Sequence, residues 1–308
     1  MAIKLHFLGT GCMVPTKDRN HLSIALEREG SIFLFDCGEG TQIQIRKMKL
    51  PLSKIKKIFI SHWHGDHTLG INGLVQTLSN TDNVSKVEIY GPANTKFHID
   101  HMFKSTIFEP KIEICVTELT PLQGELIKVF ENSEIEIFTA KLQHGVDCIG
   151  YLFKEKDTLN IDKKKLKEIA PELESNPLLN RIKMGFDIQY NGVDIKYKDL
   201  TYVKEGMKIA LVFDTRPCAG ISLLAKDVDY LVMESTFIHK QHKEKAEEFD
   251  HMSAKETAEI ALLNNVSNLI ITHFSQRYKD TKEIESEAKE IFENTTSTYD
   301  LMTLTLKK

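Results

Sequence analysis

The chain has 308 residues, of which 41% are hydrophobic and 27% are charged, as is typical of a folded globular protein. Its 16 glycines and 8 prolines are too few for a fibrous or low-complexity protein, and no run of about 18 apolar residues could span a membrane as a helix. The net charge of −4 argues against a protein that attracts polyanions over its whole surface.

Short segments rich in β-branched and aromatic residues recur along the chain with alternating or continuous apolar patterns, which predict strands. In chain order, we expect strands at residues 4–9, 23–27, 31–36, 57–61, 87–90, 111–116, 126–130, 135–140, 149–153, 208–214, 230–234, 269–272 and 303–306.

Apolar residues at helical spacing, preceded by turn or cap residues, predict helices at residues 40–49, 68–79, 95–104 and 253–265. So many strands with so few helices do not fit a doubly wound parallel sheet. The pattern favours an α+β fold in which two mixed sheets pack face to face with helices outside, an αββα sandwich.

Residues 154–205 differ from the rest of the chain because they are polar, dense in charge and only weakly periodic. We interpret them as an insertion that projects from one main domain spanning residues 1–308. Residues 1–80 hold ten Lys or Arg against six Asp or Glu, so the N-terminal part could provide a local site for an anionic ligand.

The start of the chain and its cysteines favour a cytoplasmic protein. The first residues contain no apolar segment of the kind found in secretory signals. The 5 cysteines are widely spaced and form no C-x-x-C pair, which fits reduced thiols better than disulfides or a thiolate zinc site. Any metal should therefore be held by histidine and carboxylate side chains.

The strongest chemical signal is the segment HWHGDH at residues 62–67, directly after a predicted strand. His62, His64, Asp66 and His67 place four potential ligands in six residues. Imidazole nitrogens and carboxylate oxygens bind zinc, and a catalytic site leaves one position open for water. The alternation of these side chains along one loop predicts ligands for two metal ions rather than one.

Two metal ions need more ligands than one loop supplies. Three isolated residues at the ends of predicted strands could provide them, namely His144, Asp214 and His273. A single strand-end histidine is usually structural, but three such residues beside this loop favour a metal site.

Over nearly its whole length, the sequence resembles the metallo-β-lactamase fold hydrolases and, within them, the ribonuclease Z family. The loop at 62–67 alone is typical of the larger group, whereas the other motifs are more specific to ribonuclease Z. The resemblance depends on HFLGTG at 6–11, PTKDRN at 15–20, FDCGEGTQ at 35–42, HWHGDH at 62–67, DTRP at 214–217, EST at 234–236 and THFSQRY at 272–278.

The resemblance implies a metallo-β-lactamase αββα sandwich with two zinc ions per subunit, although Mn²⁺ or Fe²⁺ would accept the same ligands. The implied ligands are His62, His64 and His144 for one ion and Asp66, His67 and His273 for the other, with Asp214 between them. Asp66 would also act as catalytic base or orient the attacking water, and Asp36 would hold the histidine loop by hydrogen bonds.

RNA cleavage also requires an acid, because the leaving group is a poor alkoxide. The resemblance implies His251 as this acid and Glu234 as the carboxylate that orients it and raises its pKa. Family members usually have His before that Glu, where this chain has Met233. His239 and His242 are the competing candidates, but they lie in a charged segment that is typical of a solvated helix.

The resemblance further implies that Lys17, Arg19 and Asn20 contact the acceptor end of a tRNA, because their donors suit phosphates and base edges. The insertion at 154–205 corresponds to a flexible arm that grips the tRNA elbow in the family. Family members are commonly homodimers, so we also expect a homodimer, with no membrane association.

The function implied is a zinc-dependent endoribonuclease that removes the 3′ trailer from precursor tRNA, leaving a 3′-hydroxyl on the tRNA and a 5′-phosphate on the trailer. The alternative is a di-metal phosphodiesterase or esterase for small substrates, which would have no use for the arm. A catalytically silent RNA-binding relative would have lost ligands. A flavin-linked di-iron oxidoreductase usually has Glu where this chain has His64.

Overall fold

The computed structural model describes residues 3–308 and divides them into two compact units. We call them the main domain, which consists of the described residues up to Phe130 with Ile137–Phe153 and Ile209–Lys308, and the arm, which consists of Glu131–Glu136 and Lys154–Lys208. The arm contains the segment that the sequence marks as an insertion.

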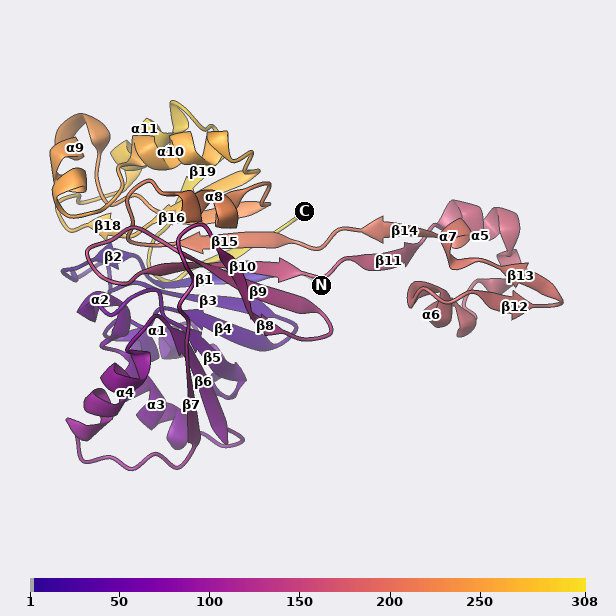
Figure 1. Ribbon diagram of the computed structural model, residues 1–308, viewed down its shortest axis with the longest axis horizontal. Helices are drawn as coiled ribbons and strands as arrows, with labels where there is room; N and C mark the ends of the chain where they lie inside the picture. Colours follow the sequence, from indigo (N-terminus) through magenta and orange to yellow (C-terminus); the bar gives the residue numbers. More distant parts are fainter. Residues whose placement is uncertain (1–2) are drawn as a thin grey trace. The chain divides into compact units, whose positions relative to one another are not determined.

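The first sheet of the main domain has seven strands and is mixed (Figure 1). Its order is β20 (Met302–Thr305), β1 (Lys4–Gly9), β3 (Ser23–Arg28), β4 (Ser31–Phe35), β5 (Ile55–Phe59), β6 (Lys86–Gly91) and β7 (Glu113–Glu118). The pairs from β20 to β4 are antiparallel, and those from β4 to β7 are parallel.

The second sheet also has seven strands. Its order is β19 (Thr295–Ser297), β17 (Asn268–Thr272), β16 (Tyr230–Glu234), β15 (Lys208–Val212), β10 (Ile149–Glu155), β9 (Ile135–Lys141) and β8 (Leu126–Glu131). Strands β15, β16, β17 and β19 are parallel, so their carboxyl ends lie at one edge of the sheet.

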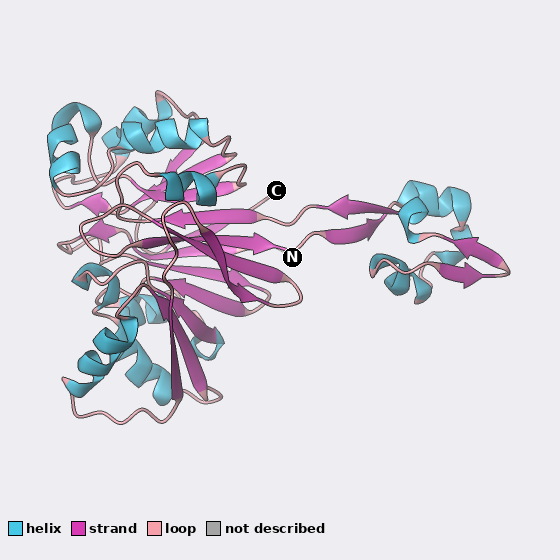
Figure 2. Ribbon diagram, in the orientation of Figure 1, coloured by secondary structure: helices cyan, strands magenta, loops and turns pink. Residues whose placement is uncertain are grey.

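Helices lie on the outer side of both sheets, where apolar side chains join them to the strands (Figure 2). The first sheet packs against α1 (Thr41–Lys47), α3 (Ile71–Ser79) and α4 (Thr95–Lys104), and the second against α8 (Ala219–Ala225), α10 (Ala254–Leu263) and α11 (Lys282–Lys289). The predicted αββα sandwich is thus confirmed, and each predicted strand and helix overlaps one in the structure. Helices α8 and α11 were not predicted.

Strand β4 shows why its sequence is continuously apolar. Ile32 and Leu34 belong to the cluster beneath the helices, whereas Phe35 faces the second sheet. The Tyr151 ring lies 5.7 Å from the Phe35 ring and 5.4 Å from the Phe59 ring, measured between centroids. Because the sheet is buried on both faces, both sets of side chains along the strand must be apolar.

The arm has more regular structure than its polar composition predicted. It contains the pairs β11 (Thr158–Ile161) with β14 (Thr201–Lys204) and β12 (Ile188–Tyr190) with β13 (Val193–Ile195), and the helices α5 (Lys163–Ile169), α6 (Leu178–Lys183) and α7 (Tyr197–Leu200). Leu166, Leu173, Ile182 and Leu200 are buried in a small core of its own. Within residues 3–308, no helix combines the length and the apolar character needed to cross a membrane.

Candidate metal centre and active site

The predicted ligands come from loops at the ends of strands in both sheets. The loop at 62–67 follows β5 of the first sheet and leads into the short helix α2 (Gly65–Thr68). In the second sheet, Asp214 follows β15, Glu234 ends β16 and His273 follows β17. Because these three strands are parallel, their carboxyl ends bring the three side chains to one edge.

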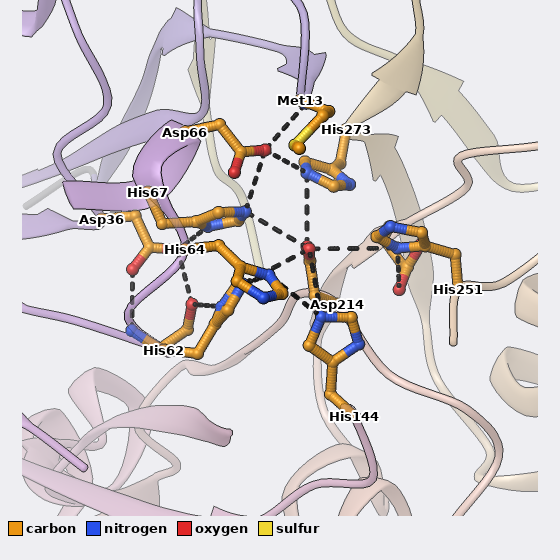
Figure 3. A network of polar contacts seen from close by, with 12 residues as sticks. Met13, Asp36, His62, His64, Asp66, His67, His144, Asp214, His251 and His273 are labelled. Atoms are coloured by element: carbon orange, nitrogen blue, oxygen red, sulfur yellow. Dashed lines mark hydrogen bonds and ion pairs between the residues drawn. The ribbon is translucent and has the colours of Figure 1, made fainter. Parts of the chain in front are cut away.

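Asp214 lies at the centre of the cluster (Figure 3). Its Oδ2 atom is 3.5 Å from His62 Nε2, 3.4 Å from His67 Nε2 and 4.0 Å from His144 Nε2. Its Oδ1 atom is 3.3 Å from His273 Nε2. One buried carboxylate thus faces the imidazoles of four other proposed ligands.

The donor atoms fall into two sets on either side of Asp214. In the first, His64 Nδ1 lies 3.0 Å from His62 Nε2 and 3.3 Å from His144 Nε2. In the second, Asp66 Oδ2 lies 3.5 Å from His67 Nε2 and 3.6 Å from His273 Nε2. The structure therefore brings the seven predicted ligands together, in two sets that Asp214 joins.

Three buried donor atoms in this cluster have no hydrogen-bond partner: His67 Nε2, His273 Nε2 and Asp214 Oδ1. An unpartnered buried polar atom costs free energy. A divalent cation would satisfy all three at once, and the nitrogen and oxygen donors suit zinc, manganese or iron. The residues therefore fit the metal ions that the fold family implies.

The charges of the cluster also fit a cation. Burial on its own raises the pKa of Asp214, but the imidazoles of His273 and His67 outweigh this and hold the pKa well below its usual range. Burial likewise raises the pKa of Asp66, which His67 and His273 lower more strongly. Both carboxylates thus stay ionised and provide the negative charge that metal binding uses.

Asp36 holds the histidine loop from beneath. Its Oδ2 atom lies 2.7 Å from His67 Nδ1 and accepts a hydrogen bond from Ser61 Oγ, while Oδ1 accepts one from the Ser61 amide. Ser61 Oγ in turn lies 3.0 Å from His62 Nδ1. These contacts occupy the Nδ1 atoms of two proposed ligands and leave their Nε2 atoms for the cluster.

Two further ligands are held by residues that sequence reasoning missed. Thr236 Oγ1 lies 3.1 Å from His273 Nδ1, and the Asp250 carbonyl oxygen lies 3.0 Å from His144 Nδ1. Thr236 belongs to the EST motif, so its proximity to Glu234 in the sequence was a usable signal. Asp250 contributes only a backbone atom, which no sequence motif reveals.

His251 and Glu234 form the pair that was proposed as acid and orienting carboxylate. His251 Nδ1 is 3.1 Å from Glu234 Oε2, and 3.9 Å from Asp214 Oδ2. Burial alone lowers the pKa of His251, but these two carboxylates outweigh it and raise the pKa to about 12. The two carboxylates therefore favour the protonated imidazole.

The competing histidines lie elsewhere, in or beside α9 (His239–Glu248). His239 Nδ1 bonds Ser253 Oγ, and His242 Nδ1 bonds the Tyr278 hydroxyl. Neither histidine lines the cavity beside the cluster, which has a volume of about 380 Å³. That cavity is lined by residues that include His64, Asp66, His144, Asp214, His251 and Arg277.

Cys12 and the Met13 amide were also missed by sequence reasoning. Both residues line this cavity, and the Met13 amide donates a 2.8 Å hydrogen bond to Asp66 Oδ2. The spacing of cysteines predicts disulfides and thiolate pairs, but it does not reveal a single thiol that lies beside histidines.

The loop at 15–20 divides into exposed and buried residues. The Lys17 side chain is 90% exposed, and Asn20 is partly exposed. Arg19 is buried, and its guanidinium donates to the backbone carbonyls of Ser275 and Tyr278. We therefore correct the prediction for Arg19: its donors hold this loop to the THFSQRY segment and are not presented to a substrate.

We expect Gly38→Ala to weaken both stability and metal binding. A Cβ atom at Gly38 would lie 2.3 Å from the Asp66 carbonyl oxygen and 2.4 Å from His21 Cβ, so the loop that carries Asp66 must shift. Overpacking of this kind costs about 1–3 kcal/mol. Urea unfolding and metal content per chain, measured on the same preparation, test this expectation.

Gly30→Ala is the matched control, since an added Cβ there meets nothing within 4 Å and only the positive φ of 74° opposes it. It should cost about 1 kcal/mol and leave metal content unchanged. Equal metal content in Gly38→Ala and the wild type would show that the close approach of Gly38 to Asp66 does not support the site.

The αββα sandwich is the metallo-β-lactamase fold, and this cluster of nitrogen and oxygen donors is of the kind that holds divalent metal ions. The chain is similar to the Ribonuclease Z of Sulfurisphaera tokodaii, with 37% identity over 95% of this chain and 94% of that protein. It is also similar to the Ribonuclease Z of Bacillus cereus, with 38% identity over 96% of each chain. The chain belongs to the ribonuclease Z family.

Two solved structures are also similar to this chain, and a family model of a different description matches part of it. Human short-form tRNase Z is 26% identical, covers 98% of each chain and superposes with a TM-score of 0.72. The metallo-beta-lactamase fold protein YhfI of Bacillus subtilis is 15% identical over 99% of each chain, with a TM-score of 0.69, and shows the fold alone. The family model described as Anti-Pycsar protein Apyc1 matches residues 3–213 and thus ends before Asp214.

Proposed function

We propose that this protein is a di-zinc endoribonuclease that removes the 3′ trailer from precursor tRNA. The products would be a tRNA with a 3′-hydroxyl and a trailer with a 5′-phosphate. The observation that carries the proposal is the cluster of seven potential metal ligands around Asp214, four of which line one cavity together with His251, the partner of Glu234. The full-length relatives named Ribonuclease Z and tRNase Z support RNA, and tRNA in particular, as the substrate.

The chain's residues divide the work of the site. His62, His64 and His144 would hold one ion and Asp66, His67 and His273 the other, with Asp214 shared. When bound, such ions would lower the pKa of a water and stabilise the charge that develops on the oxygens at phosphorus. Zinc is the ion that we propose, and manganese and iron would accept the same donors.

Asp66 and His251 would handle the protons. The Asp66 carboxylate, which accepts a hydrogen bond from the Met13 amide, would orient the attacking water or accept its proton. The oxygen of that water bonds to phosphorus and the bond to the 3′-oxygen breaks. His251, kept protonated by Glu234, gives its proton to that departing 3′-oxygen, which becomes the 3′-hydroxyl of the tRNA.

RNA binding would use the exposed donors around the site. We assign Lys17 and Asn20 to contacts with the acceptor end, and the arm to contacts farther along the tRNA. The arm presents exposed cations at Lys163, Lys164, Lys165, Lys167, Arg181 and Lys183. We further propose that the protein acts as a cytoplasmic homodimer, as expected from the family resemblance.

The direct test is cleavage of unmodified precursor tRNA by the purified zinc-loaded protein, with the ends of both products mapped. A single cut that leaves a 3′-hydroxyl on the tRNA and a 5′-phosphate on the trailer is expected. Failure to cut precursor tRNA, together with rapid hydrolysis of a small aryl phosphodiester, would contradict the proposal and favour a small-substrate phosphodiesterase.

Removal of the arm should separate RNA binding from chemistry. Strands β11 and β14 pair up to Ile161 and Thr201, so residues 162–200 can be replaced by an Asn-Gly turn that closes the hairpin. The proposed ligands lie outside this segment. We expect a raised KM for precursor tRNA and unchanged hydrolysis of an aryl phosphodiester. The salt dependence of binding should become flatter by about one unit of log-log slope for each phosphate that the arm no longer neutralises.

The control keeps the arm and changes Lys163, Lys164, Lys165 and Lys167 on α5 to glutamine. It should flatten the salt dependence in the same direction without altering the arm's core, because these four side chains are exposed while Leu166 between them is buried. An arm-replaced protein that is folded but retains the wild-type KM and salt slope would refute the role of the arm.

A further inference from the structure

Cys12 is a buried side chain that lines the cavity of the site and that the proposed mechanism does not use. Its exposed fraction is 8%, and it lines the same cavity as His251 and Asp214. Its Sγ atom, a carboxylate oxygen of Asp66 and a ring nitrogen of His273 all lie within 4.8 Å of one another.

The backbone holds this thiol in place from two sides. Cys12 ends the two-residue strand β2 (Gly11–Cys12), which pairs in parallel with β18 (Phe274–Ser275), directly after His273. The next residue, Met13, donates its amide hydrogen to Asp66 Oδ2. The backbone of Cys12 is therefore fixed to the segments that carry Asp66 and His273.

A second observation concerns His273, the histidine beside this thiol. His273 Nε2 is fully buried and has no hydrogen-bond partner, although Asp66 Oδ2 lies 3.6 Å away and Asp214 Oδ1 3.3 Å away. Zinc–sulfur bonds of about 2.3 Å and zinc–nitrogen bonds of about 2.0–2.1 Å place two donors of one ion within roughly 4.4 Å. The separations of the three donors are bounded by 4.8 Å, which is close to this limit.

We propose that Cys12 Sγ is an additional ligand of the metal ion held by Asp66, His67 and His273. The inference depends on the di-metal site of the proposed function and adds a soft sulfur donor to it. On binding, the thiol gives its proton to solvent and the sulfur forms the bond to the metal ion.

The other cysteines have different surroundings. Cys37 lies in the core beneath the helices, and Cys148 Sγ donates to the backbone oxygen of Asp214. Cys115 lies on β7 and Cys218 precedes α8, and both are partly exposed. Cys115 is therefore a suitable control for the chemistry of a thiol outside the cavity.

A sulfur ligand would change which metals the site prefers. Thiolates favour zinc and cadmium, whereas manganese favours oxygen donors. Cys12→Ser should therefore lower zinc affinity by about tenfold or more, while manganese affinity changes little. Removal of a residue that only hydrogen-bonds to a metal ligand already lowers metal affinity by roughly 10–100-fold, so loss of a ligand should cost at least as much. Competition with a chelator, followed for each metal alone, measures both affinities without an activity assay.

The decisive test loads the full-length protein with Co²⁺ under anaerobic conditions and records its absorption spectrum. Visible d–d bands report that cobalt is bound, and a near-ultraviolet thiolate-to-cobalt band reports a sulfur ligand. We expect both features in the wild type and in Cys115→Ser, and the d–d bands alone in Cys12→Ser and Cys12→Ala.

Each other outcome overturns the inference. Bound cobalt without the sulfur band in the wild type, or with the band retained in folded Cys12→Ala, would exclude Cys12 as a ligand and leave the di-metal site intact. Absence of bound cobalt would refute the di-metal site itself. X-ray absorption of the zinc-loaded wild type needs no variant, and a fit without a sulfur scatterer at about 2.3 Å would also refute the proposal.

Discussion

Replacing His64 with alanine is expected to abolish hydrolysis of both precursor tRNA and a small aryl phosphodiester. His64 Nδ1 lies within 3.3 Å of ring nitrogens of His62 and His144, so its loss leaves two histidines and Asp214 to hold the first ion. Asp66→Ala should have the same effect, because Asp66 is proposed both as a ligand and as the group that orients water. We expect losses on the order of 10³-fold or more, the scale found when a central catalytic group is removed.

The measurement is turnover on both substrates together with metal content per chain. His101→Ala is the control, since this histidine is exposed on α4 and its Nδ1 contacts only the Phe97 carbonyl oxygen. It should retain wild-type activity and metal content. Near-normal turnover of either substrate by folded His64→Ala or Asp66→Ala would defeat the di-metal assignment.

The second large effect is a difference between substrates. His251→Ala should slow cleavage of precursor tRNA by about 10²–10⁴-fold, because the ribose 3′-oxygen leaves poorly without a proton. An aryl phosphodiester has a leaving group that departs without protonation, so its hydrolysis should fall far less. The variant should also keep its metal, because no proposed ligand is changed.

His242→Ala provides the comparison for His251. Its ring contacts the Tyr278 hydroxyl and does not line the cavity, so both activities should remain near the wild-type level. Kinetics of both variants on both substrates decide the assignment. Losses of equal size on the two substrates in His251→Ala would remove His251 from the acid role.

The strands of the main domain were predictable because the apolar pattern of each sequence reflects which of its side chains are buried. The run from Ile32 to Phe35 is apolar at every position because the helices cover one face and the second sheet covers the other. The arm was harder to predict, since Leu166, Leu173 and Ile182 are separated by charged residues. Such isolated apolar residues reveal a core only when folding brings them together.

The candidate site was likewise predictable from the sequence only in part. The HWHGDH loop predicted a metal centre by its density of donors, and the strand-end positions of His144, Asp214 and His273 added the other ligands. Burial of Arg19 could not be foreseen, because it depends on carbonyl groups more than 250 residues away. The position of Cys12 depends in the same way on the pairing of β2 with β18.

The origin of the ligands in two different sheets has a consequence for unfolding. The loop at 62–67 belongs to the first sheet, whereas Asp214 and His273 belong to the second. Two bound metal ions would therefore cross-link the two layers. A metal ion whose free concentration is 100 times its dissociation constant would add about 2.7 kcal/mol to the free energy of unfolding. Removal of the metal ions by a chelator should thus weaken the contact between the two sheets first. The concentration of free metal would then control the stability of the folded protein as well as its activity.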